Sequence, residues 1–182
     1  MKLPEIKFAK TESLVLRCCR NNLTSFNGFK WKKAGVVKAT DWKPLKECGN
    51  GLHGWLKGEG QSDVWVMSRD DVWMVLAVKT KDIVDLNGKV KFPSCRVLYV
   101  GKREIATALV GQNYPTARVI YGTATAGVGG TATAGYKGIL QIKTWDTEDS
   151  RHRIIIGYVG ENGLKPGCKY KLDEHAQFVS AQ

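Results

Sequence analysis

Gly122-Thr-Ala-Thr-Ala-Gly-Val-Gly129 is followed at once by Gly130-Thr-Ala-Thr-Ala-Gly-Tyr-Lys137, a nearly perfect repeat with a period of eight residues. A fixed short period is typical of one structural unit that stacks on itself. Side chains of a strand alternate between its two faces, so Thr123 and Thr125 should project from one face and Ala124 and Ala126 from the other. The glycines between the strands allow tight corners. The repeat therefore predicts a small β-coil within a larger chain.

The eight-residue register continues on both sides of the two perfect copies, through residues 114–121 and 138–145. If each coil takes two octads, residues 116–120 stack on 131–135, and 123–127 stack on 139–143. Alanines facing inward bury little apolar area, and such area contributes only about 25 cal/mol per Å². We therefore expect the coil to need a cap at each end.

The fold class is predicted to be mainly β (α+β), with β-hairpins and a few short helices. The chain has 182 residues, 43% of them hydrophobic, and six tryptophans, which suffices for a real core. We expect a basic β-rich domain over 1–105, a short octad β-coil over 106–145, and C-terminal capping strands over 146–182. Asn87-Gly88 predicts the clearest hairpin turn, within 83–92. Residues 102–110 are predicted to be helical, 41–47 to contain a helical turn or two, and 62–71 are ambiguous.

The charge of +11 is concentrated near the N-terminus, because residues 1–60 carry 12 Lys or Arg and 5 Asp or Glu. A positive field of this kind attracts anionic partners. The predicted anion-binding surface consists of Arg17, Arg20, Lys30, Lys32, Lys33, Lys38, Lys43 and Lys46. Phe29 and Trp31 either stack on nucleic-acid bases between these lysines, or form core with the lysines on its solvated side. Both interpretations stay open.

Catalytic and metal-binding motifs have little support, and we predict no cofactor and no metal. Cys48 and His53, with Cys18 and Cys19 upstream, are potential zinc ligands, but adjacent cysteines close a tetrahedron poorly. His53 is expected to bond within its own glycine-rich loop, and Cys48 with His53 lacks a third orienting group for nucleophilic catalysis. We find no signal-peptide-like start and no apolar run long enough to cross a membrane, so reduced cysteines in a cytosol are expected.

A distinctive set of segments consists of Leu14-Val-Leu-Arg-Cys-Cys-Arg20, Gly28-Phe-Lys-Trp31, Val37-Lys-Ala-Thr-Asp-Trp-Lys-Pro44, Cys48-Gly-Asn-Gly-Leu-His-Gly54 and Lys89–Val100. These segments resemble an uncharacterised domain of bacterial and phage proteins. In phage relatives, that domain precedes GTATAG-type octads, and a closing segment similar to 155–166 follows. The resemblance implies a phage or prophage origin and brings no established activity.

The octads also resemble those of bacterial ice-nucleation proteins, in which Thr-x-Thr rows on a flat β-coil order water. The resemblance implies a repeat surface formed by Thr123, Thr125, Thr131 and Thr133. With only two perfect octads, we expect this patch to be too small to template ice. A structural coil or a small docking surface is the favoured interpretation.

The functional hypothesis is a non-enzymatic phage accessory protein in the cytoplasm of an infected host cell. Its basic surface would bind a nucleic acid, a nucleotide signal or an acidic host protein, with inhibition of host antiviral defence as one such task and no membrane partner. Two alternatives stay open. One is an enzyme resembling ADP-ribosyltransferases, with Arg17 and either Glu59 or Glu104 in catalytic roles. The other is a self-associating structural or virion protein that forms homo-oligomers.

Overall fold

The structure is a computed structural model that describes all residues except 1–2, 26, 61–70 and 182. It divides the chain into two compact units, unit 1 over Met1–Ala117 and unit 2 over Arg118–Gln182. The finer division into three parts stays a prediction. In the described part of the chain, no helix has both the length and the apolar character needed to cross a membrane.

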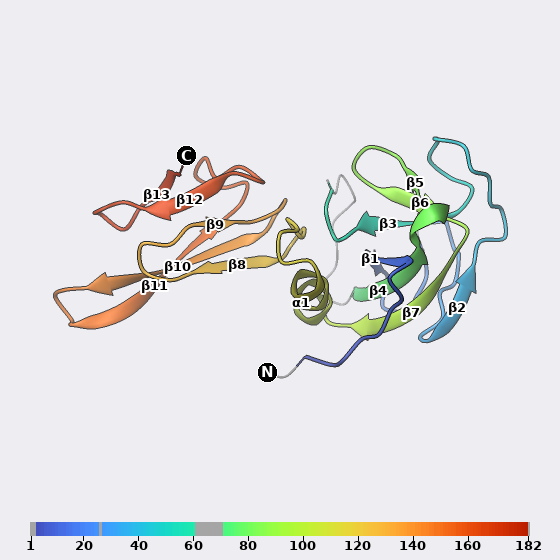
Figure 1. The fold of residues 1–182 in the computed structure, drawn as a ribbon, viewed down its shortest axis with the longest axis horizontal. Coiled ribbons are helices and arrows are strands. Elements are labelled where there is room, and N and C mark those ends of the chain that lie inside the picture. The colour runs from blue at the N-terminus through green and yellow to red at the C-terminus, as the bar shows by residue number, and fades with distance from the viewer. Residues whose placement is uncertain (1–2, 26, 61–70, 182) are drawn as a thin grey trace. The chain divides into compact units, whose positions relative to one another are not determined.

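The chain forms thirteen strands, one α-helix and one 3₁₀ turn among the described residues (Figure 1). In chain order they are β1 (Glu12–Cys19), β2 (Gly35–Lys38), β3 (Leu52–Leu56), β4 (Val72–Lys79), η1 (Thr80–Asp82), β5 (Val84–Asp85), β6 (Val90–Phe92), β7 (Ser94–Gly101), α1 (Arg103–Asn113), β8 (Thr123–Ala126), β9 (Ala132–Thr133), β10 (Ile139–Asp146), β11 (Arg151–Tyr158), β12 (Lys169–Leu172) and β13 (Phe178–Ser180). The prediction of a mainly β fold with few helices is confirmed.

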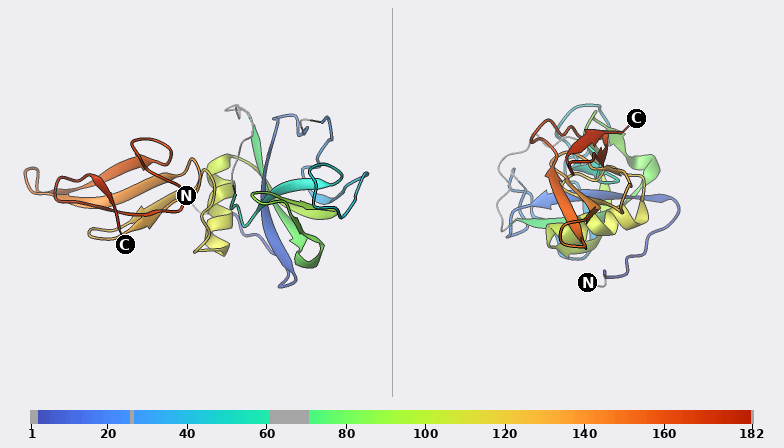
Figure 2. Two further views of the ribbon diagram at one scale, coloured as in Figure 1. Left: turned by 90° about the horizontal axis from the view of Figure 1, so that it is seen from above. Right: turned by 90° about the vertical axis from the view of Figure 1, so that its left-hand side faces the viewer.

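Unit 1 is built on a seven-stranded sheet in the order β2-β7-β4-β1-β3-β6-β5. Its central strands β1 and β4 pair antiparallel along their whole lengths, and their middle residues are buried on both faces. On one face, Val15 and Leu76 belong to a large apolar cluster. Helix α1 packs against β4 and β1, and lies against one side of the sheet (Figure 2). Burial on both faces explains why these two strands are continuous hydrophobic runs.

Two local predictions in unit 1 are confirmed and one is wrong. The hairpin at Asn87-Gly88 forms between β5 and β6, and both turn residues have the positive φ of a type I′ turn, 58° and 113°. The helix predicted over 102–110 is α1. Residues 41–47 form a loop without a helical turn, since Pro44 offers no amide hydrogen and disfavours helix at the residue before it. The ambiguous stretch 62–71 lies, except for Asp71, outside the described residues.

Unit 2 consists of two three-stranded sheets, β11-β10-β8 and β13-β12-β9. Their inner faces share one apolar cluster, to which β10 contributes Leu140 and Ile142, β9 contributes Ala132, and β12 contributes Tyr170. The unit is therefore a small two-layer sandwich that contains the octads, and its C-terminal end forms the hairpin β12–β13, which pairs with β9.

Candidate functional site

The octads fold into a coil with a repeat of sixteen residues. Strand β8 pairs in parallel with β10, so that Thr123 lies beside Ile139 and Ala126 beside Ile142. In the other half of the coil, a Cβ placed on Gly135 would lie only 2.3 Å from the carbonyl oxygen of Arg118, so the chain passes close by itself there as well. The prediction that each coil takes two octads is confirmed for β8 and β10. Residues 116–120, expected to be a strand, have no regular secondary structure.

Backbone turns recur at the octad period. The amide of Gly122 donates to Val119 O (3.1 Å), that of Gly130 to Gly127 O (3.0 Å), and that of Gly138 to Gly135 O (3.0 Å). Each bond closes a four-residue β-turn. The eight-residue period is thus the spacing between corners, and two corners complete one coil.

The four predicted repeat-surface threonines do not gather in one patch. Thr123 and Thr125 are exposed on β8, whereas Thr131 and Thr133 lie at β9 on the opposite sheet, with Thr133 half-buried. The alanines between them point inward: Ala132 is buried, and Ala124 and Ala126 pack against the same cluster. Successive octads face opposite ways because each is half of a coil.

The two threonine pairs have different neighbours. Beside Thr123 and Thr125, β10 places Ile139 and Gln141 at equivalent positions, which are uncharged. Beside Thr133, β12 places Lys169, an exposed cation. Thr123 and Thr125 are therefore the more exposed pair, and the side chains next to them on β10 are uncharged.

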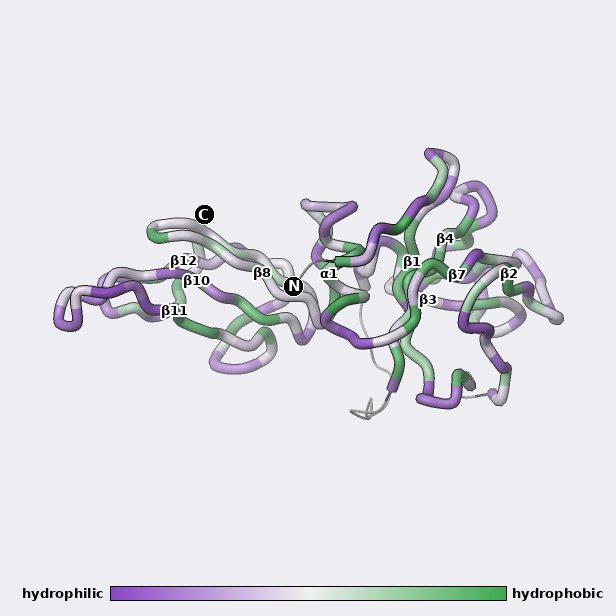
Figure 3. The backbone as a smooth tube through the Cα atoms, turned by 90° about the horizontal axis from the view of Figure 1, so that it is seen from below, coloured by the Kyte–Doolittle hydropathy of each residue, from purple (hydrophilic) through white to green (hydrophobic). Residues whose placement is uncertain are grey.

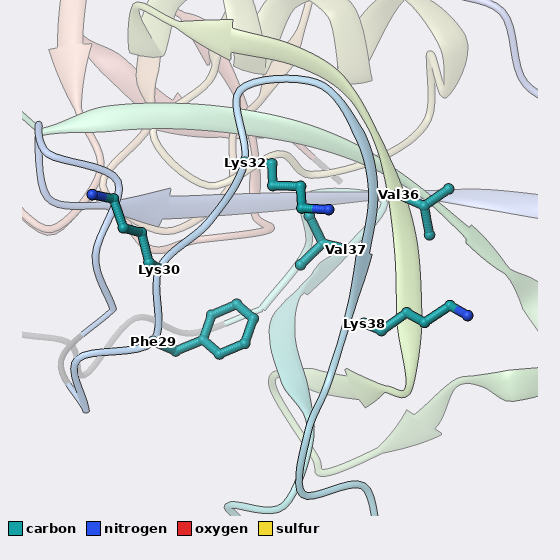
Figure 4. A pocket seen from close by; sticks show the side chains of 6 residues that line it. All are labelled: Phe29, Lys30, Lys32, Val36, Val37 and Lys38. Carbon is teal, nitrogen blue, oxygen red and sulfur yellow. The ribbon is translucent and has the colours of Figure 1, made fainter.

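The predicted basic residues are only partly brought together. Lys30, Lys32 and Lys38 line an open groove of about 420 Å³ with Phe29, Val36 and Val37. Figure 4 shows that Lys30 and Lys38 point in opposite directions. Trp31 is 3% exposed and belongs to the core, which confirms the core interpretation for this ring. Phe29 is half-buried: it packs against the same core and also lines the groove. The other members of the predicted set are exposed and lie outside this groove lining: Arg20, Lys33, Lys43 and Lys46.

Arg17 is half-buried, and its guanidinium is engaged inside unit 1. Its guanidinium donates to the carbonyl of His53 (2.6 Å) and to Ser25 Oγ (2.8 Å), and it lies 4.6 Å from the centre of the Trp31 ring. Burial lowers its pKa below the usual value. This side chain holds the β1–β3 region together and leaves the groove to the lysines. The sequence does not reveal that Arg17 faces inward, because an arginine is expected to be exposed unless something shows otherwise.

The loop around Cys48 is organised by two lysines. Lys89 Nζ donates to Cys48 Sγ (2.9 Å), which lowers the pKa of this exposed thiol. Lys91, only 1% exposed, donates to the carbonyls of Glu47 (2.9 Å) and Gly49 (3.3 Å), on either side of Cys48. His53 Nε2 accepts from the Gly49 amide (3.3 Å), which confirms its bond within the loop. Among the described residues, no three potential ligand side chains gather as a metal site.

Comparison with known proteins finds similarity to bacterial ice nucleation proteins. The chain is 39% identical over 102 residues to the ice nucleation protein of Pseudomonas fluorescens, covering 55% of this chain and 8% of the relative. It is 33% identical over 99 residues to InaU of Pantoea ananas (53% and 10%), and 36% identical over 113 residues to the ice nucleation protein of Xanthomonas campestris pv. translucens (61% and 7%). The chain thus spans a tenth or less of these relatives. Each match is longer than all of unit 2, so the similarity extends beyond the octads. No solved structure matches.

These relatives correct the functional hypothesis. The resemblance of the octads to ice-nucleation repeats is confirmed. The prediction of a phage accessory protein that binds nucleic acid, a nucleotide or an acidic host protein and inhibits host defence is wrong, because the relatives are bacterial ice nucleation proteins. The predicted location in the cytoplasm of an infected host is wrong for the same reason. The ADP-ribosyltransferase and virion-protein alternatives have no support among the relatives, and Arg17 is engaged in the core.

Unit 1 is covered by a separate match. A family model with the description "Domain of unknown function (DUF7666)" matches residues 13–109, more than half of the chain and most of the seven-stranded sheet with α1. The chain therefore belongs to the DUF7666 domain family.

Proposed function

We propose that the octad coil is a water-ordering element of the ice nucleation type. The observation that carries this proposal is the sixteen-residue parallel register, which exposes Thr123 and Thr125 while Ala124 and Ala126 face the core. The similarity to proteins named ice nucleation proteins supports the same assignment.

The physical basis is the fixed spacing of hydroxyl groups. Alternate residues of a strand lie about 6.8 Å apart, and neighbouring strands about 4.8 Å apart. Threonine is stiff at χ1, so its hydroxyl and methyl groups hold their positions relative to the backbone. Water molecules that bond to such hydroxyls are held in a repeating arrangement. A surface that holds water in this way lowers the entropy cost of forming the first ice layer.

The size of the array limits what this segment achieves alone. On the β8 side, only one strand carries Thr-x-Thr, because the next strand places Ile139 and Gln141 in the same rows. We therefore expect activity to grow with the number of stacked coils.

The test adds coils and measures freezing. One, two or four copies of residues 122–137 are inserted after Lys137, and the freezing temperature of supercooled droplets is recorded for each protein. We expect the temperature to rise with each added sixteen-residue coil. In the matched control, the added coils carry Val at every threonine, which keeps the shape and the strand propensity and removes the hydroxyl.

Two results would refute the proposal. One is equal freezing temperatures for the threonine and valine arrays, provided that circular dichroism shows both to be folded. The other is a freezing temperature that does not change with the number of threonine coils.

A further inference from the structure

The loop over residues 47–51 is held against the sheet of unit 1 by side chains from two paired strands. Strand β6 contributes Lys91, whose Nζ donates to the carbonyl oxygens of Glu47 (2.9 Å) and Gly49 (3.3 Å). Strand β3 contributes His53, which lies directly beside Lys91 and accepts from the amide of Gly49 at Nε2 (3.3 Å). The backbone is therefore fixed on both sides of the residue between these two carbonyls.

That residue is Cys48, and a second lysine meets its side chain. Lys89 Nζ donates to Cys48 Sγ across 2.9 Å. The loop is also closely packed at its end, since a Cβ on Gly51 would lie 2.8 Å from the ring of Trp42. Because the loop backbone is anchored at several points, the contact between the amine and the sulfur follows from the fold of the loop.

Cys48 differs from three other cysteines of unit 1 in its exposure and its acidity. It is exposed, and the hydrogen bond from Lys89 lowers its pKa below the usual value. Cys18 and Cys19 end β1, a strand that Figure 3 shows as mostly hydrophobic. Burial raises the pKa of Cys18 to about 12 and that of Cys19 to about 11, and likewise raises the pKa of Cys95 to about 12. Since oxidants attack the accessible thiolate, Cys48 should react first among these four.

We infer that Cys48 and Lys89 form a modification site, at which a peroxide oxidises the sulfur and the lysine amine captures it as a reversible sulfur–nitrogen cross-link. Sulfenic acids condense with a neighbouring nitrogen or thiol, and here the nitrogen already touches the sulfur. The bond would join residues 41 positions apart and tie the 47–51 loop to the residue after the Asn87-Gly88 turn. This chemistry goes beyond the proposed ordering of water and does not rest on it.

The cross-link forms in two balanced steps. In the first, the thiolate attacks one oxygen of hydrogen peroxide and the O–O bond breaks. With one proton from solvent the products are the sulfenic acid and water, and the two electrons lost by sulfur are gained by the peroxide oxygens. In the second, the lysine gives one proton to solvent and its neutral amine attacks the sulfur. The S–N bond forms, the S–O bond breaks, and the hydroxide leaves with a further amine proton as water.

The test treats the folded full chain with about two molar equivalents of hydrogen peroxide at pH 7 and reads the product by mass spectrometry. We expect the protein to lose about 2 Da, because the cross-link removes two hydrogens, and dithiothreitol to restore the original mass. Trypsin should release peptide 47–57 joined to peptide 82–91, since the modified Lys89 is no longer a cleavage site.

Lys89→Arg is the matched variant, because it keeps a cation beside the sulfur while its guanidinium stays protonated and does not act as a nucleophile. Cys48 should still be oxidised there, and dimedone, which captures sulfenic acids, should label it at least about tenfold more than in the unchanged protein. Lys46→Arg is the control, since it removes an exposed amine two residues from Cys48 and should leave the cross-link yield unchanged. Unfolding in urea should lower the yield at least about tenfold, because the two groups are no longer held together.

Three results would overturn the inference. The first is a sulfinic acid or a disulfide at Cys48 in the folded protein, with no S–N cross-link. The second is a cross-link that Lys46→Arg reduces as much as Lys89→Arg does. The third is an equal yield in the folded and the urea-unfolded chain, which would show that the fold does not position the pair. Droplet freezing is measured separately, so the water-ordering proposal keeps its own test.

Discussion

Gly135 and Gly127 occupy the same position in successive octads, yet they should respond in opposite ways to alanine. A Cβ on Gly135 would lie 2.3 Å from Arg118 O and 2.8 Å from Val119 O, both backbone atoms of the preceding coil. A Cβ on Gly127 would have no atom within 4 Å. Neither glycine has a positive φ, so the contrast isolates packing between coils from backbone preference.

The magnitude follows from the contact. Real Cβ atoms do not approach other heavy atoms closer than 3.0 Å, and this Cβ would lie 2.3 Å from Arg118 O, so the 118–119 segment must move by several tenths of an ångström. Overpacking of this kind costs about 1–3 kcal/mol. The nearby bond from the Tyr121 amide to Tyr136 O (2.9 Å) would lengthen, which adds about 1 kcal/mol. We therefore expect Gly135→Ala to lower the free energy of unfolding of unit 2 by about 2–4 kcal/mol, or about 10–25 °C in Tm for so small a unit.

Gly127→Ala should be neutral or stabilise by up to about 1 kcal/mol, because alanine restricts the unfolded chain. Hydrogen exchange read by mass spectrometry separates the units, since peptides from 118–182 report on unit 2 alone. Exchange should accelerate there in Gly135→Ala and stay unchanged in peptides from 3–117. Equal exchange in the two variants would refute the close stacking of the coil at Gly135.

Three further predictions concern unit 1. Burial, followed by the positive charges of Lys89, Arg17 and Lys91, lowers the pKa of His53 from 6.5 to about 4. Between these two values the unfolded chain binds a proton at this histidine and the folded chain does not. The free energy of unfolding therefore falls as the pH falls from 6.5 towards 4. Urea unfolding from pH 7 to pH 4 should show this loss, and His53→Gln should reduce the slope. Lys89→Met should slow alkylation of Cys48 by iodoacetamide at pH 7, followed by peptide mass spectrometry, because the thiol loses the ammonium that lowers its pKa; an unchanged rate would show that this pair does not control the thiolate. Asn87→Ala should lower the free energy of unfolding by about 1–2 kcal/mol, because φ is 58° there, whereas Asn87→Gly should be tolerated.

The regular parts of the fold could be predicted because local pattern and tertiary position agree. Alternation in the octads gave the correct inward and outward faces, and Asn87-Gly88 gave the correct turn. The segment 116–120 differs because a strand there would need a continuous ladder, whereas Pro115 and the turn that closes at Gly122 interrupt it. The two threonine pairs lie on different sheets because each octad forms only half of a coil. The eight-residue spacing does not by itself indicate this, because it does not identify which segments stack on each other.

Local sequence patterns do not indicate the burial of a side chain where a distant loop covers it, or its exposure where nothing packs on its sheet face. Alternation in β6 places Lys91 where a solvated side chain is expected, but the loop around Cys48 covers it. The run Ile154 to Ile156 reads as a strand buried on both sides, yet the structure leaves Ile154 and Ile156 exposed and turns Ile155 inward. Neither the covering loop nor the uncovered face leaves a mark in the local sequence, because both depend on residues distant along the chain.

The enclosed ammonium of Lys91 makes this lysine a reporter of loop opening. Acylating reagents need a free amine with access to solvent, and at 1% exposure this amine is held between two carbonyl oxygens and 5.8 Å from the centre of the Trp42 ring. Its labelling rate would therefore measure how often the loop lifts from the sheet. Once acylated, the nitrogen would carry a bulkier neutral amide that does not fit the same space, so each labelled molecule would keep a permanent record that its loop had opened.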